Sequence, residues 1–564
     1  MEENFLRALL IALLAASVIA ALMHRLRQSL LIGYLFAGVL IGPSGLALVR
    51  KNDVIQDLAE VGVIMLMFTL GAEFSLSQLK RLKKAALLGG SIQLWGTMLL
   101  VGVVFGLVYH DWYGGFFTGS ILAISSTVIV LKLLQEGGGL RSAHGTAALG
   151  ISIYQDVMVV PLMLVLAAFG GRAGSPWSTL GESLGKSAVF LGVSWLASRF
   201  LAGRFLEMVA RTRSKELFTI SSVVLCLGIA WLAQSLGLSL ALGAFVAGLL
   251  VSSSIYSHKI LSDVSPFRDC FLSLFFISIG MLVDVGWAFQ HLGEVMAWSW
   301  AGIVAKAVIC SVACLVCGFS IRSSLLAGFC LAEAGEFSFV ILLDGVRQKV
   351  ITQDRYQLLL AVILVSLVAV PALWKAFGRW ATWISQRPLL QSWEAKRYAA
   401  EAGPRTEPLR DHVVLVGCGP FGQVVLQALH LDGVTSVVLD LNPDTIRHLQ
   451  KAGYNAVYGE AGNHQILELL QIERARAMVV TIPDLHAAEA IIREAREQRP
   501  DLPILARACF APEVQTLRKA GATQVVYEEM EAASEMARIL ERRLSGDGAR
   551  EKVASGARAM PLAR

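Results

Sequence analysis

The sequence predicts a polytopic α-helical membrane protein that ends in a Rossmann-like α/β domain. Of the 564 residues, 55% are hydrophobic and only 16% are charged, whereas soluble domains carry about 25% charged residues. Charged residues are sparse up to about residue 385 and dense beyond it. This shift predicts a membrane domain over residues 1–385, a linker over 386–410, a soluble domain over 411–545 and a basic, disordered tail over 546–564.

About thirteen segments of the membrane domain are predicted to span the bilayer, since a span needs roughly 20 apolar residues. Several of them are interrupted by glycine or proline. The first begins with acidic residues and has no small-residue cleavage site, which favours a span over a signal peptide. The predicted spans are centred near residues 14, 38, 65, 97, 125, 157, 194, 225, 246, 275, 307, 334 and 367.

The loops between the spans predict the orientation. With the N-terminus outside, the inner loops hold 16 basic residues and the outer loops hold seven, and cytoplasmic loops carry the excess of Lys and Arg. We therefore expect a multi-pass protein of the cell (inner) membrane with a cytoplasmic C-terminal domain. The net charge of +6 reflects these loops and the tail, so no nucleic-acid partner is expected. The cysteines fit packing better than a metal site.

Ionisable residues inside the predicted spans are candidates for function, because a charge in the bilayer is costly. Asp156 is the strongest candidate, since its span has no basic residue within ten positions on either side. Lys306 lies deep in the eleventh span, and Glu333 and Glu336 lie in the twelfth. A structural ion pair is as good an interpretation of Lys306 as a direct role in transport. The bracing of a broken helix is likewise as good an interpretation of Glu336.

A polar break is predicted in each half of the membrane domain. Ser125, Ser126 and Thr127 precede the charged sixth span, and the span of Lys306 precedes a polar, glycine-containing one. This reversed arrangement is typical of inverted repeats whose discontinuous helices cross at the midplane. We expect carbonyls at the half-helix ends to help coordinate a cation beside Asp156. Helix packing through hydroxyl groups is the alternative interpretation for the three polar residues.

The soluble domain opens with a nucleotide-binding pattern, "DHVVLVGCGPFGQVVLQALHLDGVTSVVLDLNPD". A strand precedes the glycines, a helix follows them, and an acidic residue ends the next strand. Gly417 permits a tight turn, Gly419 lets a phosphate approach the backbone, and Gly422 allows close helix–strand packing. Asp440 would bind a ribose 2′-hydroxyl. Three more strands are predicted in "NAVYGE", "AMVVTIPD" and "PILARACF". A vestigial nucleotide site is the alternative.

Several motifs together resemble the monovalent cation:proton antiporter-2 family, and most closely its Kef-type potassium/proton antiporters. They are "ISSTVIVLKLLQE", "GISIYQDVMVVPLM", "ALGAFVAGLLVSSSIYSHKI", "SPFRDCFLSLFFISIGMLVD" and "AEAGEFSFVI". The similarity covers nearly all the spans and continues through "RKAGATQVVYEE" into a domain that resembles the RCK/KTN regulators of potassium transport.

The resemblance implies a homodimer with a moving ion-binding core. In such a family Asp156 holds a proton and a cation alternately, within a site lined by Ser125, Ser126, Thr127 and Gln155, and Glu336 belongs to the crossing helix of the core. A single aspartate is similar to the electroneutral members, whereas electrogenic relatives often have two. The regulatory nucleotide would be NAD(H), AMP or ATP. Its expected contacts are Gly417, Gly419, Pro420, Phe421, Gly422, Asp440, Gly459, Glu460 and Ala461.

The leading hypothesis is therefore a secondary transporter that exchanges K⁺ for H⁺ under nucleotide control, with Na⁺ as the alternative cation. An RCK-gated cation channel is a second hypothesis, but no TVGYG-type filter is present. A membrane-anchored nucleotide sensor or oxidoreductase is a third, although a mere anchor would not need buried charges, and no enzyme activity is expected. The loop "YSHKILSD" departs from the acidic loop of glutathione-gated members, which argues against gating by glutathione adducts.

Overall fold

The computed structural model describes most of both predicted domains. The chain divides into two compact units, one covering residues 1–140 and 144–385 and the other chiefly residues 386–564. The predicted span near residue 194, together with Glu460 and Ala461, lies outside the described residues, which are 2–25, 29–49, 53–73, 84–136, 139, 142–170, 185, 192, 207–209, 211–212, 214–235, 240–252, 254, 256–347, 350–385, 387–390, 392–394, 410–441, 443–459, 466–467 and 470–544.

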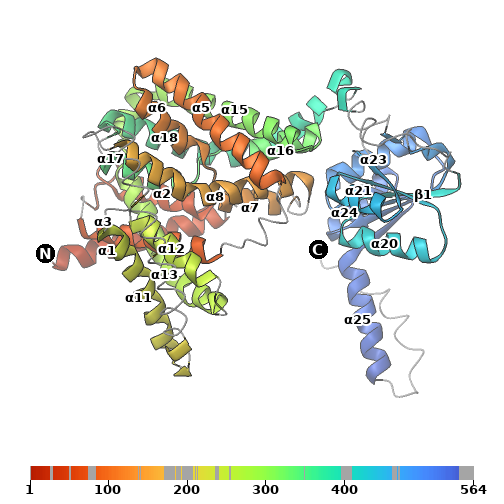
Figure 1. Cartoon of the computed structure of the whole chain (residues 1–564), viewed down its shortest axis with the longest axis horizontal. Helices are drawn as coiled ribbons and strands as arrows, with labels where there is room; N and C mark the ends of the chain where they lie inside the picture. The colour runs from red at the N-terminus through yellow and green to blue at the C-terminus, as the bar shows by residue number, and fades with distance from the viewer. Residues whose placement is uncertain are drawn as a thin grey trace. The chain divides into compact units, whose positions relative to one another are not determined.

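The described residues of the first unit form helices and the turns that connect them, with no strand among them (Figure 1). Among the described residues, eight helical segments are long and apolar enough to cross a membrane, one of them interrupted at residues 124–126, and four shorter helices are also apolar. Eleven of these twelve segments contain the centre of a predicted span, and the twelfth, Ile321–Cys330, ends just before the centre predicted near residue 334. The fold class predicted from the sequence is therefore confirmed for this unit.

One group of helices in this unit packs through backbone contacts at glycine. In this group α3 packs against α12 and α13, and α2 packs against α13 and α1. A Cβ atom at Gly38 of α2 would lie 2.1 Å from the carbonyl oxygen of Ile277 in α13, so only glycine allows this approach. The members are α1 (Glu2–Arg25), α2 (Leu30–Ile41), α3 (Asp53–Glu73), α11 (Lys215–Ser235), α12 (Leu240–Ser252) and α13 (Ser257–Met281).

The other group contains two chain segments of the same design. In each segment a long helix packs against a short helix, which ends inside the unit. After a few non-helical residues the chain forms another helix. The first segment comprises η1 (Lys84–Gly89), α5 (Gly90–Tyr109), α6 (Trp112–Ala123), α7 (Thr127–Glu136) and α8 (Ala143–Gly170). The second comprises α14 (Val285–Gln290), α15 (Leu292–Val316), α16 (Ile321–Cys330), α17 (Glu336–Arg347) and α18 (Gln353–Ser385).

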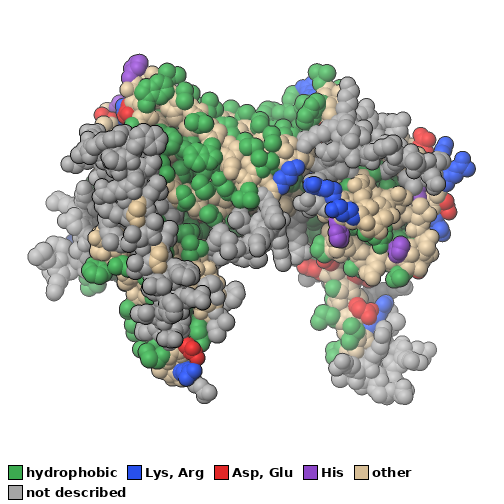
Figure 2. Space-filling model, in the orientation of Figure 1, with side chains coloured by type: hydrophobic (Ala, Val, Ile, Leu, Met, Phe, Trp, Pro, Cys, Tyr) green, Lys and Arg blue, Asp and Glu red, His purple; other side chains and the backbone are tan. Residues whose placement is uncertain are grey.

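The outer surface of this group is apolar, as a bilayer requires. On α15, Val304, Val308, Val312 and Val316 recur every four residues and are 47–57% exposed. Figure 2 shows hydrophobic side chains gathered over the surface of α5, α6 and α15. Exposure of such a stripe to water is unfavourable in free energy, whereas contact with lipid acyl chains is not.

The second unit contains a six-stranded parallel sheet with the strand order β3-β2-β1-β4-β5-β6. Its first strand is buried along its whole length, as is typical of parallel sheets covered on both faces. The strands are β1 (His412–Val416), β2 (Ser436–Asp440), β3 (Asn455–Tyr458), β4 (Ala475–Val480), β5 (Ile504–Ala508) and β6 (Gln524–Tyr527). The helices are α20 (Pro420–Leu431), α21 (Pro443–Lys451), η3 (Ile472–Arg474), α23 (Leu485–Gln498), α24 (Ala511–Ala520) and α25 (Glu528–Leu544).

The sequence predicted five of these strands and missed β6 as a separate element. This strand has four residues, none of them fully buried. A short edge strand lacks the continuous buried pattern that identifies the inner strands of a parallel sheet. The predicted Rossmann-like arrangement is nevertheless confirmed.

Candidate functional site

The two interrupted helices cross at their breaks. The backbone leaves helical geometry at residues 124–126, between α6 and α7, and at residues 331–335, between α16 and α17. The Gly335 N–H donates to the Ile124 carbonyl at 3.0 Å, and the Ser125 hydroxyl donates to the Leu331 carbonyl at 2.8 Å. A Cβ atom at Gly335 would lie 2.6 Å from the Ser125 backbone, so this position requires glycine. We call residues 124–126 and 331–335 the crossing.

Lys306 of α15 binds both carbonyl ends of the crossing. Its Nζ donates to the Ile124 carbonyl at 2.8 Å and to the Glu333 carbonyl at 2.7 Å, and the side chain is 2% exposed. The C-terminal end of a helix carries a partial negative charge, which a buried ammonium group offsets. Both carbonyls are therefore bound by the Lys306 ammonium group, and the expectation that half-helix carbonyls help to coordinate a cation stays a prediction. Ile124 already accepts two hydrogen bonds, from Lys306 and Gly335.

Glu333 caps the N-terminal end of α7. One of its carboxylate oxygens accepts a hydrogen bond from the Ser126 N–H at 3.0 Å, just before α7 begins, and the side chain is fully buried. The N-terminal end of a helix carries a partial positive charge, so a carboxylate is the matching cap. Glu336, the first residue of α17, is hydrogen-bonded to the Ser126 side chain. The geometry of both glutamates is thus that of braces for the crossing.

Asp156 lies beside the break between α6 and α7. It belongs to α8 and is 7% exposed, and its Oδ2 accepts a hydrogen bond from the Thr127 hydroxyl at 2.7 Å. The carboxylate and this hydroxyl therefore lie together at the crossing, as predicted. Oxygen atoms of this kind are the ligands that hard cations prefer.

Gln155 contacts the break at Ser125. The Gln155 Oε1 accepts from the Ser125 N–H at 2.9 Å. The Gln155 Nε2 donates to Oε1 of Gln93 in α5 at 2.5 Å, and the Gln93 Nε2 donates to the Ala123 carbonyl at 2.9 Å. Among the predicted site residues, Thr127 contacts Asp156 directly, whereas Gln155 and Ser125 hold the backbone next to it.

Two side chains that complete the crossing were missed by sequence reasoning. Gln93 lies in the apolar stretch "SIQLWG", where a single polar residue gave only a weak signal. Ser366 of α18 accepts a hydrogen bond from the Ala334 N–H at 3.1 Å and so satisfies part of the second break. Serine is common enough in membrane helices that neither its type nor its spacing marked it.

The soluble unit forms the predicted glycine loop at the end of β1. Gly417 has φ of +89°, and a Cβ atom there would lie 2.8 Å from the Ile482 side chain. At Gly422 a Cβ atom would lie 2.2 Å from the Gly417 carbonyl oxygen, which explains the close approach of α20 to β1. Gly419 is the N-cap residue of α20, is exposed and has open space where a Cβ atom would be. Each glycine has the geometry expected of it.

Other predicted nucleotide contacts surround the loop. The Asp440 Oδ2 at the end of β2 accepts a hydrogen bond from the Cys418 N–H at 2.5 Å. Phe421 is half-buried beneath the Arg507 guanidinium, which lies 4.9 Å from the ring centroid, and Pro420 is exposed in the first turn of α20. Gly459 is buried, and its N–H donates to the Asp440 carbonyl at 3.2 Å. A loop, a helix N-terminus and a carboxylate therefore meet at the carboxyl edge of the sheet, where dinucleotides bind in such folds.

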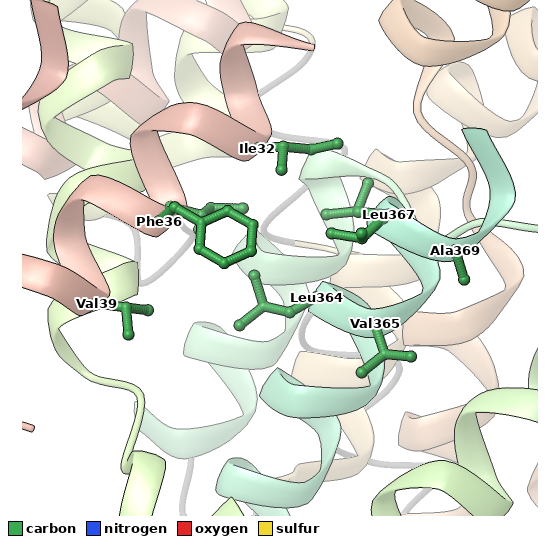
Figure 3. Close-up of a pocket in the computed structure, with 9 residues that line it drawn as sticks. Ile32, Phe36, Val39, Leu364, Val365, Leu367 and Ala369 are labelled. Carbon is green, nitrogen blue, oxygen red and sulfur yellow. The ribbon is translucent and has the colours of Figure 1, made fainter. Parts of the chain in front are cut away.

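A separate apolar groove of about 330 Å³ lies between α2 and α18 (Figure 3). Its walls offer no oxygen ligand from a side chain, so it does not suit a cation. The lining residues are Ile32, Leu35, Phe36, Val39, Leu364, Val365, Leu367, Val368 and Ala369.

Comparison with known proteins identifies the family. Residues 10–376, more than half of the chain, match the family described as "Sodium/hydrogen exchanger, transmembrane". The chain belongs to the sodium/hydrogen exchanger family. Residues 413–528 match the TrkA-N domain. This exchanger is thus a multi-pass membrane protein with a C-terminal soluble domain, and the resemblance predicted from its motifs is confirmed.

Two relatives are similar to this exchanger over most of their length. The candidate K⁺ efflux antiporter KefB of Alkalimonas amylolytica is 32% identical over 511 residues, covering 89% of this chain and 76% of that protein. The candidate cation/proton antiporter YbaL of Escherichia coli is 32% identical over 543 residues, covering 95% and 97%. Both relatives are named as antiporters and not as enzymes.

A solved structure supports the fold of the membrane unit. The sodium proton antiporter MjNhaP1 of Methanocaldococcus jannaschii aligns with 67% of this chain and 99% of its own, at a TM-score of 0.53 and 15% identity. At this identity the similarity concerns the fold alone. It confirms the predicted antiporter-like arrangement of the helices.

Proposed function

We propose that this exchanger moves a monovalent cation, K⁺ in the first place, in exchange for H⁺ by alternating access. The observation that best supports this proposal is the buried Asp156 carboxylate, which accepts a hydrogen bond from Thr127 beside the crossing of two broken helices. A carboxylate buried within a membrane domain requires a proton or a counter-ion. Proton and cation then compete for one site.

Exchange follows from this competition if only the occupied site changes its exposure between the two sides of the membrane. Asp156 holds a proton in one direction and a cation in the other, and Thr127 orients the carboxylate in both states. Ser125, Ser126 and Gln155 keep the break in place, and Lys306, Glu333 and Glu336 neutralise and brace the helix ends. One carboxylate that binds one positive charge each way makes the exchange electroneutral.

The relatives support K⁺ as the cation, because one of them is named as a K⁺ efflux antiporter. Na⁺/H⁺ exchange is the second candidate, since an antiporter named for sodium shares the fold. We further propose a homodimer in the cell membrane, with the N-terminus outside and the soluble domain of residues 411–545 in the cytoplasm. The positive-inside bias of the loops supports this orientation.

We also propose that the soluble unit binds a regulatory adenine nucleotide, NAD(H), AMP or ATP. The open backbone at Gly419 suits a phosphate, and Asp440 at the end of β2 suits a ribose hydroxyl. Binding titrations of the full-length protein with each nucleotide would identify the ligand. An absence of binding by all three would contradict a regulatory nucleotide site of this kind.

Asp156→Asn tests the central proposal. In proteoliposomes that contain a pH-sensitive dye, we expect the wild type to move protons in response to K⁺, Na⁺, Li⁺ or Rb⁺ gradients. The amide of the variant cannot bind and release a proton, so its exchange should fall to the level of empty liposomes. Asp269→Asn is the matched control, because Asp269 is exposed on α13 and pairs with Arg268. Unchanged exchange in Asp156→Asn would exclude this residue as the ion site.

The same liposomes test electroneutrality and regulation. Clamping the membrane potential at different values should leave the exchange rate unchanged if no net charge crosses the membrane. Adding the nucleotide that binds should change the rate in the wild type. A steep dependence on potential would contradict a one-for-one exchange.

A further inference from the structure

We infer that Gln93 is a positioning residue for the Asp156 site, acting through Gln155 and the break between α6 and α7. The inference rests on the proposed function, because it assumes that Asp156 binds the exchanged ions. Gln93 lies on α5, outside the residues that form the break, and its side chain is fully buried.

The contacts of Gln93 form a closed ring of hydrogen bonds on the break. The ring runs from the Ala123 carbonyl to the Gln93 amide at 2.9 Å, from there to the Gln155 amide at 2.5 Å, and on to the Ser125 N–H at 2.9 Å. Both ends of the ring are backbone groups, two residues apart, on either side of Ile124. The ring therefore ties α5 and α8 to the point where α6 stops.

The chemistry of the two ends gives both amides a single orientation. The Ala123 carbonyl can only accept a hydrogen bond, so the Gln93 NH₂ group must face it. The Oε1 of Gln93 then faces the Gln155 NH₂ group, which leaves the Gln155 Oε1 for the Ser125 N–H. A reversed Gln155 amide would set a donor against the Ser125 donor and an acceptor against the Gln93 acceptor. Gln93 thus orients Gln155.

This orientation reaches the ion site through two adjacent contacts between the break and α8. Gln155 holds Ser125, and two residues further along the chain the Thr127 hydroxyl donates to Asp156 at 2.7 Å. Because Gln155 and Asp156 are neighbours on α8, a shift of the break at Ser125 also moves Thr127 away from the carboxylate. The cation would then meet its oxygen ligands at less favourable distances and bind more weakly.

Gln93→Met tests this role, because methionine has a similar shape and cannot hydrogen-bond in this way. We expect the half-saturating K⁺ concentration for exchange to rise about tenfold, which corresponds to about 1.4 kcal/mol. The maximal rate should change less, since Asp156 itself remains. Thr97→Val is the matched control, since Thr97 is also buried on α5 and accepts a hydrogen bond from Gln93 at 3.3 Å that does not lead to the site.

A double variant separates positioning from a general packing defect. If Gln93 acts through Gln155, the pair Gln93→Met and Gln155→Met should raise the half-saturating concentration no further than Gln155→Met alone. Effects that multiply would overturn the inference, as would a half-saturating concentration in Gln93→Met equal to that of Thr97→Val. K⁺-dependent thermal stabilisation of the detergent-solubilised protein provides a readout of binding that does not require transport.

Gln93→Asn and Asp156→Asn complete the test. If Gln93→Met does not fold, Gln93→Asn decides the question. This variant keeps the amide but shortens the side chain by one methylene. We expect its half-saturating K⁺ concentration to rise by less than that of Gln93→Met, and that of Thr97→Val not to rise. An unchanged half-saturating concentration in Gln93→Asn would overturn the inference. If instead Asp156→Asn retains exchange, the proposed function fails, whatever Gln93 does.

Discussion

Both units of this exchanger bring helix ends to a candidate ion site, but they treat the charge of those ends in opposite ways. In the membrane unit, Lys306 binds the carbonyl ends of the crossing and Glu333 binds the N-terminal end of α7. In the soluble unit, the exposed Gly419 is the N-cap residue of α20, and no side chain among the described residues caps this helix end. The helix ends are neutralised in one unit and left open in the other.

The difference follows from the solvent around each unit. Inside a bilayer no water can hydrogen-bond to an open helix end, so protein groups must satisfy it. In water an open N-terminus costs little and remains available to a diffusible anion. In the membrane unit the ion site is therefore expected to depend on a carboxylate and a hydroxyl, whereas in the soluble unit it is expected to depend on backbone N–H groups.

Lys306→Met should have the largest effect, because it removes the neutralising group from the membrane unit. The substitution removes two hydrogen bonds made by a buried ammonium group. It also removes the positive charge that lies near the Glu333 carboxylate. We expect exchange to be lost and stability to fall by roughly 3–5 kcal/mol. Liposome exchange and thermal unfolding in detergent measure the two effects.

Lys259→Met is the control for this substitution. Lys259 is exposed and lies 4.2 Å from the centroid of the Phe218 ring, a contact that contributes about 0.5–1 kcal/mol at an exposed site. If Lys306→Met were as stable and active as Lys259→Met, the helix ends would not need a cation, and the contrast between the two units would lose its basis.

Gly419→Ala and Gly422→Ala test the open helix end in the soluble unit and should have intermediate effects. A Cβ atom at position 419 meets open space, so Gly419→Ala should fold normally and weaken nucleotide binding by obstructing the phosphate. A Cβ atom at position 422 meets the Gly417 carbonyl at 2.2 Å, so Gly422→Ala should also lower stability by about 1–3 kcal/mol.

Nucleotide titration and thermal unfolding of the two full-length variants separate these effects. In both variants, exchange measured without nucleotide should stay near that of the wild type, because the Asp156 site is untouched. Tight nucleotide binding by Gly419→Ala would place the phosphate elsewhere.

Local patterns predicted much of both sites. The polar run at residues 125–127 marked the first break, and a lone Asp156 in an apolar span marked the candidate ion site. The spacing of Gly417, Gly419 and Gly422 marked the candidate phosphate loop, and the structure places a positive φ at Gly417, open space at Gly419 and close packing at Gly422. In each case the physical constraint acts within a few residues, so it leaves a trace in the local sequence.

The partners of these residues could not be predicted, because they come from distant parts of the chain. Lys306 was visible as a buried charge, but its bonds to the Ile124 and Glu333 carbonyls depend on how two broken helices cross. Gln155 was expected to line the ion site, yet its amide is bound between Ser125 and Gln93. A backbone carbonyl has no side-chain signature, so its partner cannot be identified from residue types.

The smallest effect concerns pH at the open helix end. Burial, and then the charge of Asp440, raise the pKa of the Cys418 thiol to about 11, whereas an ordinary thiol titrates near 8.5. The thiol in the phosphate loop therefore stays neutral at pH 9, where an ordinary one would be mostly an anion and would repel a phosphate. We expect nucleotide affinity to change less than about twofold between pH 7 and pH 9, and Cys418→Ser to behave alike. A fall in affinity as the pH rises, absent from Cys418→Ser, would show that the thiol ionises beside the bound phosphate, and that the end of α20 is less open to an anion than its geometry indicates.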